Sequence, residues 1–356
     1  MTWTITVAGD PQSVPAEDGE TVLDALLRHG VGFAYSCQSG NCGTCKCEYV
    51  AGDIFELEYS EHALSAGERS RGVILACRSQ VWSDVQIRRL SAEEFVMHPS
   101  RGMQCRVVDL SFATHDVLQL RLAVESGGPY TFSAGQFAKL QFTFAPDTPR
   151  DYSMANRPDD PLLEFHIRCI AGGVSGQIPS LLKLGDLVRV SGPFGTSYLR
   201  GEHSGPIIAI AGGTGLAPIR SIVATALGQG LHRPLHLYFG VRSERDVYAE
   251  AELRAWQARH PNLNVHVVLS EEPGLESARH SQASPGAGRL RRYGLVVDAV
   301  RGDFRDFQGF QAYLAGPPAM VDAATELLSA GGIPGRDIHA DAFYSAVDPA
   351  TAGTSA

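Results

Sequence analysis

Over the first 90 residues, apolar and polar positions follow two short periods. Trp3–Val7 alternates as a half-buried strand does, and Thr21–Gly30 has the apolar spacing of a short amphipathic helix that stops at a glycine. Three further strands are predicted at Lys46–Val50, Val73–Cys77 and Val85–Ile87. The pattern therefore predicts a small mixed α+β domain over residues 1–90.

Residues 104–203 have a different pattern, in which short apolar runs recur between glycines and prolines. Strands are predicted at Cys105–Leu110, Val117–Val124, Phe137–Phe142 and Leu162–Ile170. Short strands separated by turn residues are typical of an antiparallel β-barrel. The stretch 91–103 is mostly polar and contains Pro99 and Gly102, so it is predicted to be a linker.

From residue 204 the apolar runs become continuous, as in strands that are buried on both faces of a parallel sheet. Strands are predicted at Ile207–Ala211, Leu235–Val241, Leu263–Leu269, Leu295–Val297 and Ala312–Ala315. Helix-like stretches such as 249–260 and 319–330 separate them, so an α/β domain is predicted over 204–346. The Gly-, Ser-, Pro- and Arg-rich segment 272–292 is predicted to be an exposed loop, and 347–356 a disordered tail.

Composition and charge fit a globular protein of several domains. The chain has 356 residues, of which 44% are hydrophobic and 19% charged, and this length exceeds what one core usually organises. The net charge of −9 argues against a nucleic-acid partner. No apolar run is long enough to span a bilayer, and the first residues lack the features of an export signal. We expect a monomeric cytoplasmic protein without a membrane partner.

Acidic residues are in excess over residues 1–88, with twelve Asp and Glu against six Lys and Arg. Such a surface can steer a protein partner by its charge. A solvated acidic face is the simpler interpretation of the same excess.

Four cysteines have the spacing of an iron–sulfur site. Cys37, Cys42 and Cys45 form a C-x4-C-x2-C run, and Cys77 follows downstream. Thiolates at this spacing are the ligands of a plant-type 2Fe–2S cluster. Gly40 and Gly43 can adopt the positive φ angles of a tight loop, and free backbone N–H groups there can donate to the sulfurs.

Two other interpretations of the cysteines are weaker. A structural zinc site usually shows two CxxC-like pairs, and only Cys42 and Cys45 form one. A disulfide framework is disfavoured because the chain has an odd number of cysteines, seven, and no export signal. Cys47 is predicted to be a buried thiol beside the cluster, and Cys105 and Cys169 ordinary core residues.

Two motifs in the barrel region suit a flavin. Arg150 is able to bind a pyrophosphate, while the Tyr152 ring and the Ser153 hydroxyl suit an isoalloxazine. Gly172 to Ser175 then precede a helix-like stretch over 178–183, and glycines before a helix offer free N–H groups to a phosphate. Either motif alone is compatible with a plain turn, but their order on one barrel supports a flavin site.

Two turns in the last domain suit a dinucleotide. Gly212, Gly213, Thr214, Gly215 and Pro218 belong to a glycine-rich turn between a strand and a helix, although not to a GxGxxG fingerprint. A second turn, Gly316-Pro-Pro, lies at the carboxyl end of a later strand, where open α/β sheets bind ligands. A plain loop is the alternative for this second turn.

The segment from Gly240 to Asp246 bears on the choice of nucleotide. Arg242 and a second arginine are suited to a 2′-phosphate, whereas the acidic residues beside them favour a free ribose. Because both types are present, the residues alone leave NADH and NADPH open.

In their joint order, these motifs resemble the NADH-dependent reductase components of bacterial multicomponent aromatic-ring oxygenases, closest to the naphthalene dioxygenase type. The resemblance covers roughly residues 5–344 and implies a β-grasp 2Fe–2S ferredoxin domain, an FAD-binding barrel and an NAD-binding domain of the ferredoxin–NADP reductase type. It implies FAD contacts from Arg150, Tyr152, Ser153, His166, Ile167, Arg168, Gly172, Gly173, Val174 and Ser175. It implies nicotinamide dinucleotide contacts from Gly212 to Pro218, Gly316, Pro317 and Met320, with the aromatic Phe343 near the flavin.

Two features depart from the family pattern. Ala315 stands where the family usually carries a cysteine before the Gly-Pro turn, and the segment 272–292 is longer than usual. Loss of the cysteine removes a polarisable contact near the hydride, but no protein nucleophile is required.

The resulting hypothesis is an electron-transfer flavoprotein in which the cofactors carry the chemistry and no catalytic side chain is needed. Electrons would pass from NADH through FAD and a 2Fe–2S cluster to the Rieske centre of an oxygenase, directly or through a separate ferredoxin. The alternatives are a reductase of a diiron monooxygenase, a non-catalytic iron–sulfur redox sensor and a zinc-bearing scaffold.

Overall fold

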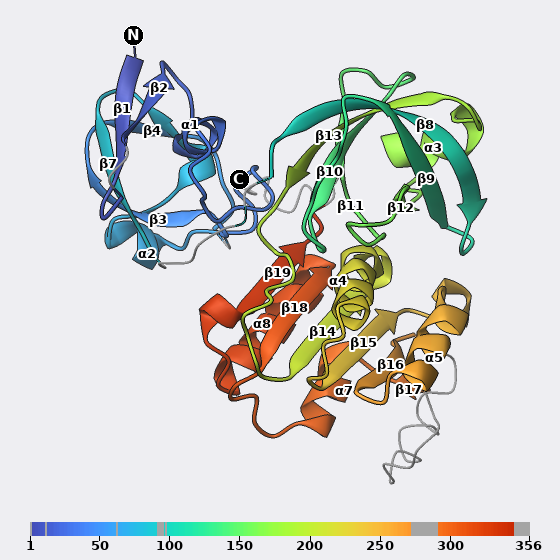
Figure 1. Cartoon of the computed structure of the whole chain (residues 1–356). Coiled ribbons are helices and arrows are strands. Elements are labelled where there is room, and N and C mark those ends of the chain that lie inside the picture. Colours follow the sequence, from blue (N-terminus) through green and yellow to red (C-terminus); the bar gives the residue numbers. More distant parts are fainter. Residues whose placement is uncertain are drawn as a thin grey trace, which may run out of the picture. The chain divides into compact units, whose positions relative to one another are not determined.

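The computed structural model describes residues 2–10, 13–61, 63–90, 96, 98–271 and 291–344. The chain divides into two compact units, residues 1–97 with 344–356, and residues 98–343 (Figure 1). We call them the first and the second unit and describe each by itself. Most of the segment predicted as a loop, 272–290, and the predicted tail, 347–356, lie outside the described residues. In the described part of the chain, no helix has both the length and the apolar character needed to cross a membrane.

The first unit is a mixed sheet that carries one main helix. Its five-stranded sheet has the order β2-β1-β7-β3-β5, and a separate ribbon pairs β4 with β6. The strands are β1 (Thr2–Val7), β2 (Ser13–Glu17), β3 (Lys46–Ala51), β4 (Ile54–Glu56), β5 (Val73–Leu75), β6 (Ser79–Val81) and β7 (Val85–Arg89). The helices are α1 (Val22–Arg28), the short α2 (Ala66–Ser70) and the 3-10 turn η1 (Ala76–Arg78).

Helix α1 forms where the apolar spacing predicts it. Thr21 caps its start, because the side-chain oxygen accepts a hydrogen bond from the Asp24 backbone N–H at 3.1 Å. Gly30, at φ +72°, follows its end, as a glycine stop requires. Leu23 and Leu26 are fully buried, so the helix closes the core of the unit over the sheet.

The second unit begins with a nearly closed antiparallel barrel. Its strands have the order β11-β10-β13-β8-β9-β12. They are β8 (Arg101–Phe112), β9 (Val117–Ser126), β10 (Phe137–Phe142), β11 (Arg150–Ser153), β12 (Leu163–Arg168) and β13 (Leu187–Phe194), with helix α3 (Val174–Leu181) after β12. A bridge between Met154 and Phe165 brings the two edge strands together, so the barrel comes close to closing.

The barrel strands differ from the prediction mainly at their ends. Strand β8 already begins at Arg101, inside the stretch predicted as linker, because its residues from Arg101 to Arg106 pair with β13. From Gln104 to Phe112 the same strand pairs with β9. Helix α3 begins at Val174 rather than at Ile178, directly after the glycines. Cys105 is buried in the barrel core as predicted, and Cys169 is half-buried.

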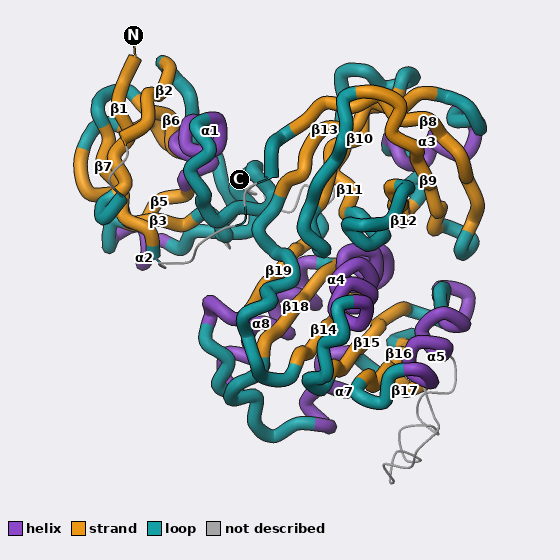
Figure 2. The backbone as a smooth tube through the Cα atoms, viewed as in Figure 1, coloured by secondary structure: helices purple, strands orange, loops and turns teal. Residues whose placement is uncertain are grey.

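The remainder of the second unit is a parallel sheet with helices on both faces (Figure 2). Its strand order is β17-β16-β15-β14-β18-β19. The strands are β14 (Ile207–Gly212), β15 (Leu235–Val241), β16 (Leu263–Leu269), β17 (Arg291–Tyr293), β18 (Gln311–Gly316) and β19 (Ile338–Ala342). The helices are α4 (Leu216–Gly228), α5 (Glu250–Arg259), α7 (Val296–Asp303) and α8 (Pro318–Ala330), with the 3-10 turns η2 (Gly213–Gly215), η3 (Glu244–Asp246) and η4 (Gly335–Asp337).

Strand β14 shows why its run is continuously apolar. Ala209 belongs to the core cluster that contains α4 and α5 residues, whereas Ile208 and Ile210 belong to the cluster that contains α7 and α8 residues. Alternate side chains therefore enter opposite cores, and neither face of the strand meets water.

The strand predicted at Leu295–Val297 is wrong. Leu295 is 61% exposed and stands at the N-cap, while Val296, Val297 and Val300 are buried along one side of α7. An apolar run of three residues fits either a strand or the first turn of a helix, and tertiary packing decides between them. The strand of this region is β17, at Arg291–Tyr293, inside the predicted loop.

Candidate cofactor sites

The four predicted cluster ligands come together in the first unit. Cys37, Cys42 and Cys45 lie in the loop between α1 and β3, and Cys77 lies in η1 rather than in the strand predicted for it. The Sγ atoms of Cys45 and Cys77 are 3.3 Å apart in a buried environment. Two thiolates on one tetrahedral metal with bonds of about 2.3 Å would be about 3.7 Å apart, so this pair fits a shared metal ion.

The arrangement of the sulfurs favours two metal ions over one. The Cys37 and Cys42 thiols are hydrogen-bonded to one another, as are those of Cys45 and Cys77. Among the described residues, the only group of three possible ligands with atoms within 4.8 Å of one another lies elsewhere, so no three of these sulfurs are that close. A single tetrahedral zinc ion would need such closeness, whereas two pairs suit the two irons of a 2Fe–2S cluster.

The loop supplies the hydrogen bonds that favour thiolates. The N–H groups of Ser39 and Asn41 point at Cys37 Sγ, at 3.5 and 3.4 Å. The Cys42 thiol and these two amides lower the pKa of Cys37 to about 5, although burial opposes them. Because iron binds the thiolate, this loop is prepared for a cluster.

Glycines make the loop possible. Gly43 has φ +70°, and a Cβ there would lie 2.7 Å from the Ala63 carbonyl oxygen. Gly40 has φ +79°, and a Cβ there would lie 2.9 Å from a side-chain carbon of Tyr59 and 2.9 Å from one of Arg78. These positions combine a left-handed backbone with no room for a side chain, as predicted.

Cys47 is fully buried on β3, and burial raises the pKa of its thiol to about 12. A neutral, enclosed thiol of this kind fits the core role predicted for it rather than that of a ligand.

In the second unit, β11 carries the predicted flavin residues along β10. Arg150 is partly exposed, and its guanidinium donates to the Pro149 carbonyl at 3.0 Å, so it stands at the rim of the barrel. Tyr152 is half-buried, and Ser153 is buried with its hydroxyl 3.4 Å from Asp341 Oδ2. Sequence reasoning gave no role to Asp341, which β19 brings to β11 although it lies far along the chain.

The side chains of β12 point in different directions. His166 is buried against Tyr248, whereas Ile167 is fully buried in the barrel core. Arg168 is exposed and pairs with Asp116 at 3.3 Å. The structure therefore places these three residues on one strand, but it does not bring their side chains to a common point.

Gly172 to Ser175 form the entry to α3. Gly172 has φ +79° and open space where a Cβ would stand, and Gly173 is the N-cap. The Ser175 hydroxyl accepts from the Ile170 backbone N–H at 3.2 Å, which fixes the turn. An open glycine such as Gly172 ahead of a helix N-terminus suits the close approach of a phosphate.

The two glycine turns of the parallel sheet are in direct contact. A Cβ on Gly215 would lie 2.1 Å from the Ala315 carbonyl oxygen, and one on Gly316 would lie 2.8 Å from the Gly212 carbonyl oxygen. A Cβ on Gly212 would lie 2.7 Å from an atom of the Pro317 side chain and 2.7 Å from the Met320 sulfur. The fold thus brings the predicted dinucleotide residues into one site at the carboxyl ends of β14 and β18.

One edge of this site stays open and the other is closed by an aromatic residue. Gly213, at φ +55°, has open space where its Cβ would be, so a ligand can reach the turn. The Phe343 backbone N–H donates to the Gly316 carbonyl at 2.8 Å, and its ring packs against the core beneath the site. Phe343 therefore lies beside the Gly316-Pro-Pro turn.

Helix α4, which contains Pro218, attaches this turn to the barrel. Arg220 donates to the Ala155 carbonyl at 2.7 Å, and Ser221 donates to the Asn156 carbonyl at 2.6 Å. Arg220 is also paired bidentately with Glu252 of α5 at 2.8 Å. These residues were not predicted, although a lone arginine within the apolar run of α4 is a signal that could have marked Arg220.

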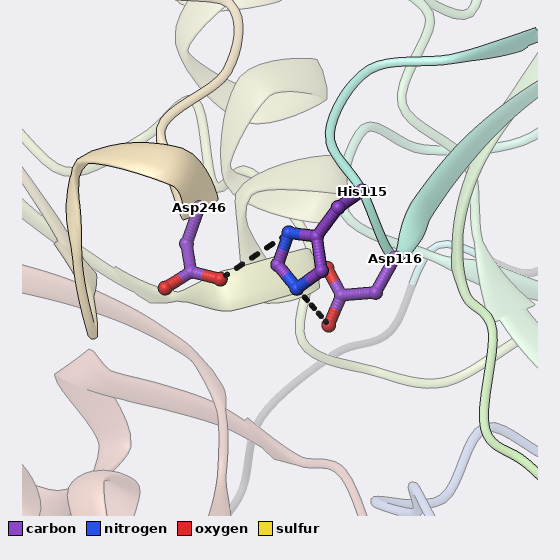
Figure 3. A group of neighbouring side chains, drawn as sticks. All are labelled: His115, Asp116 and Asp246. Atoms are coloured by element: carbon purple, nitrogen blue, oxygen red, sulfur yellow. Dashed lines mark ion pairs between the residues drawn. The ribbon is translucent and has the colours of Figure 1, made fainter.

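Figure 3 shows His115, Asp116 and Asp246, a polar group between the barrel and the parallel sheet, and Arg242 pairs with both of its carboxylates. The Arg242 guanidinium is 3.6 Å from Asp116 and 3.3 Å from Asp246. His115 lies between the same carboxylates, at 3.8 and 3.9 Å, and Arg168 pairs with Asp116. Because both carboxylates have arginine partners, the group joins two domains and is not arranged as a cation site.

Three sequence profiles match the chain in the order in which its domains occur. The 2Fe-2S iron-sulfur cluster binding domain matches residues 5–81, the oxidoreductase FAD-binding domain residues 104–198, and the oxidoreductase NAD-binding domain residues 209–326. The ferredoxin–NAD(P)+ reductase component of the naphthalene 1,2-dioxygenase and salicylate 5-hydroxylase systems of Ralstonia sp. is 44% identical over 330 residues, which cover 92% of this chain and 95% of that protein. This chain belongs to the ferredoxin–NAD(P)+ reductase components of oxygenase systems.

A second member, the reductase component of the naphthalene 1,2-dioxygenase system of Pseudomonas putida, is 39% identical and covers 93% of this chain and 95% of its own. The crystal structure of a cytochrome P450 reductase from Amycolatopsis superposes with a TM-score of 0.79 at 34% identity, covering 96% of this chain and 99% of that one. The reductase described here accordingly has 2Fe–2S, FAD-binding and NAD-binding domains, and it transfers electrons from a nicotinamide dinucleotide. This confirms the predicted fold and cofactors.

Proposed function

We propose that this reductase oxidises NADH and delivers electrons singly to the Rieske centre of an aromatic-ring dioxygenase, directly or through a separate ferredoxin. The naphthalene dioxygenase reductases among its relatives support the dioxygenase as partner. We also propose that it acts in the cytoplasm as a monomer, as the sequence predicts.

The contact between the two glycine turns is the observation that carries the proposal. Gly212 and Gly215 are packed against the segment Ala315–Met320, and Ser153 of the flavin strand lies 3.4 Å from Asp341 on the neighbouring β19. A nicotinamide ring held at these turns would lie next to a flavin held on β11. Such a fixed approach of two reactants supplies much of the acceleration of a transfer reaction.

The residues of the chain then have separate tasks. Arg150 and the α3 entry would hold the flavin pyrophosphate, Tyr152 and Ser153 would hold its ring, and the four cysteines would hold the cluster. FAD held there would supply the exchange between a two-electron hydride donor and a one-electron acceptor such as a 2Fe–2S centre. No side chain has to act as acid, base or nucleophile.

The surroundings of Arg242 support NADH over NADPH. Its guanidinium is already paired with Asp116 and Asp246, so it offers little free positive charge to a 2′-phosphate. We therefore expect kcat/KM for NADH to exceed that for NADPH by at least tenfold.

A diiron monooxygenase is the second candidate acceptor. The reductase component of a phenol 2-monooxygenase from a Pseudomonas species is 36% identical to this chain and covers 98% of it. Reconstitution with a Rieske dioxygenase and, separately, with a diiron hydroxylase would decide between them through the rate of product formation.

The experiment for the electron path separates the two cofactors. Purified protein is assayed with NADH and either cytochrome c or dichlorophenolindophenol. Replacement Cys77→Ser removes a cluster ligand, so we expect cytochrome c reduction to fall by at least a hundredfold, while flavin-mediated dye reduction stays within about threefold of the unmodified protein. Cys105→Ala, which removes a buried thiol of the barrel core that is not a proposed cluster ligand, is the matched control.

Equal loss of both activities in Cys77→Ser, with FAD still bound, would contradict the order of the carriers. Full retention of cytochrome c reduction would contradict the role of Cys77.

A further inference from the structure

A buried series of polar groups runs from the barrel to the nicotinamide turn. The His166 imidazole lies with Nε2 3.1 Å from Glu164 Oε1 and with Nδ1 3.2 Å from the Tyr248 hydroxyl. The same hydroxyl lies 3.4 Å from the Gly213 carbonyl oxygen in the glycine-rich turn. The His166 side chain is fully buried and Tyr248 is 4% exposed, so water does not compete for these contacts.

Charged groups from three other elements set the charge of Glu164. It is 3.1 Å from Arg121 of β9 and 3.6 Å from Arg220 of α4, which is itself paired with Glu252 of α5. Burial alone would raise the pKa of Glu164, but the hydrogen bond from His166 and the two arginines outweigh it and hold the pKa at about 2. Glu164 is therefore an anion that only accepts hydrogen bonds.

The negative charge of Glu164 determines which atoms of His166 and Tyr248 carry hydrogen. His166 Nε2 must carry a hydrogen to face a carboxylate, so a neutral ring leaves Nδ1 as an acceptor. Burial raises the pKa of Tyr248, which keeps its proton, and burial lowers the pKa of His166 despite the nearby Glu164. The Tyr248 hydroxyl thus has one proton for two acceptors, the imidazole Nδ1 and the Gly213 carbonyl oxygen.

We propose that Tyr248 is a positioning residue for the nicotinamide turn, and that a proton on His166 decides whether the Tyr248 hydroxyl donates to the imidazole or to Gly213. With a neutral ring the hydroxyl donates to Nδ1, and the turn lacks this donor. With a charged ring, Nδ1–H donates a hydrogen bond to the tyrosine oxygen. The Tyr248 hydroxyl, which keeps its proton, then donates its hydrogen bond to the Gly213 carbonyl.

Two consequences follow for the nucleotide, and they depend on the proposed function, in which this turn binds NADH. A hydrogen bond to the Gly213 carbonyl fixes the peptide plane between Gly213 and Thr214, whose N–H is one of the donors offered to the dinucleotide. Nucleotide affinity should therefore be higher on the acidic side of the His166 titration. A single hydrogen bond predicts a change of about two- to tenfold.

The first test determines which ring nitrogens of His166 carry hydrogen and requires no turnover of NADH. The oxidised full-length holoprotein is labelled with ¹⁵N in its histidine rings, and His166→Gln identifies the His166 signals. We expect neutral His166 to be protonated at Nε2 with a bare Nδ1, and to gain the second proton on acidification while the flavin stays bound. A neutral form protonated at Nδ1, or a ring that stays neutral at every pH at which the flavin stays bound, overturns the proposal.

The second test measures the affinity for a nucleotide one pH unit above and one pH unit below the measured pKa of His166. A reduced NADH analogue that cannot give up hydride is titrated against the holoprotein, followed by flavin absorbance. We expect the unmodified protein to bind it two- to tenfold more tightly at the lower pH, and Tyr248→Phe to bind it equally at both. Tyr238→Phe, which loses a hydroxyl bonded instead to Asp303, should keep the unmodified pH dependence.

A pH dependence retained in Tyr248→Phe, or absent from the unmodified protein, overturns the proposal. An analogue that fails to bind at any pH contradicts the proposed function instead, and the ring signals of His166 still test the proton arrangement.

Discussion

The cluster loop and the flavin–nicotinamide site are built in opposite ways. In the first, three of the four ligands, Cys37, Cys42 and Cys45, share one loop whose glycines enforce its path. In the second, the contacts join residues that are distant in sequence, with separations of 65 residues for Arg220 and Ala155 and 188 for Ser153 and Asp341. The loop depends on local backbone geometry, whereas the second site depends on the packing of a barrel against a sheet.

This difference has an energetic side. The cluster loop encloses its sulfurs with backbone amides, which need no partner from another domain. The second site encloses charged groups, Glu164 and Arg220, whose desolvation is offset only while every partner stays in place. We therefore expect single substitutions to act locally in the loop and over several elements in the second site.

The largest effect is expected where the two glycine turns meet. Gly215→Ala would place a Cβ 2.1 Å from the Ala315 carbonyl oxygen, although its own φ of −58° suits any residue. The turns must then separate, and a displacement of this size predicts a loss in kcat/KM for NADH on the order of a hundredfold. The assay is NADH-dependent dye reduction, with reduction of the bound flavin by dithionite as the measure of an intact barrel.

Gly302→Ala is the matched control, because a Cβ at that α7 position meets no atom within 4 Å. It should retain activity within about twofold, since glycine to alanine in a helix is favourable or neutral. A Gly215→Ala protein with unchanged kcat/KM would show that contact between the turns is not required for the nicotinamide site.

Much of this organisation is visible in the sequence. The cluster ligands and the glycine turns lie in contiguous motifs, and continuous apolar runs mark strands such as Ile207–Gly212. These features are local, so period and spacing are enough to find them. The assignment of Leu295–Val297 failed because three apolar residues carry no period.

The polar contacts between domains are not visible in the same way. Nothing in the segment around Tyr248 indicates that its hydroxyl meets His166, which lies 82 residues away. Asp341 likewise meets Ser153, and Arg242 meets Asp116, only when the barrel and the sheet pack. Sequence alone identifies the residue type at each position, whereas the pairing is a property of the fold.

A smaller effect is expected at the contact between the barrel and the parallel-sheet domain. Arg220→Met removes the donor to the Ala155 carbonyl and leaves Glu164 and Glu252 without their buried cation. We expect a loss of about 2 kcal/mol in the stability of the second unit, measured by urea-induced release of flavin fluorescence. Arg254→Met breaks an exposed pair with Glu250 on the same domain and should cost less than about 0.5 kcal/mol. Similar losses in both variants would mean that the buried pair has no special role.

The smallest effect distinguishes the two units by pH. Burial, with the nearby Arg200 and His203, lowers the pKa of His339 in the second unit to about 3. Because the folded-state pKa lies below the unfolded value of about 6.5, stability is constant above pH 6.5 and falls as the unfolded chain takes up the proton. Between pH 7.0 and 5.5, the free energy of unfolding measured by flavin release in urea should therefore fall by about 1 kcal/mol through His339. His339→Gln should abolish that part of the fall. Visible circular dichroism of the cluster, which reports on the first unit, should change less, because His339 belongs to the second unit. An equal loss in the unmodified protein and in His339→Gln would assign the pH dependence to other groups.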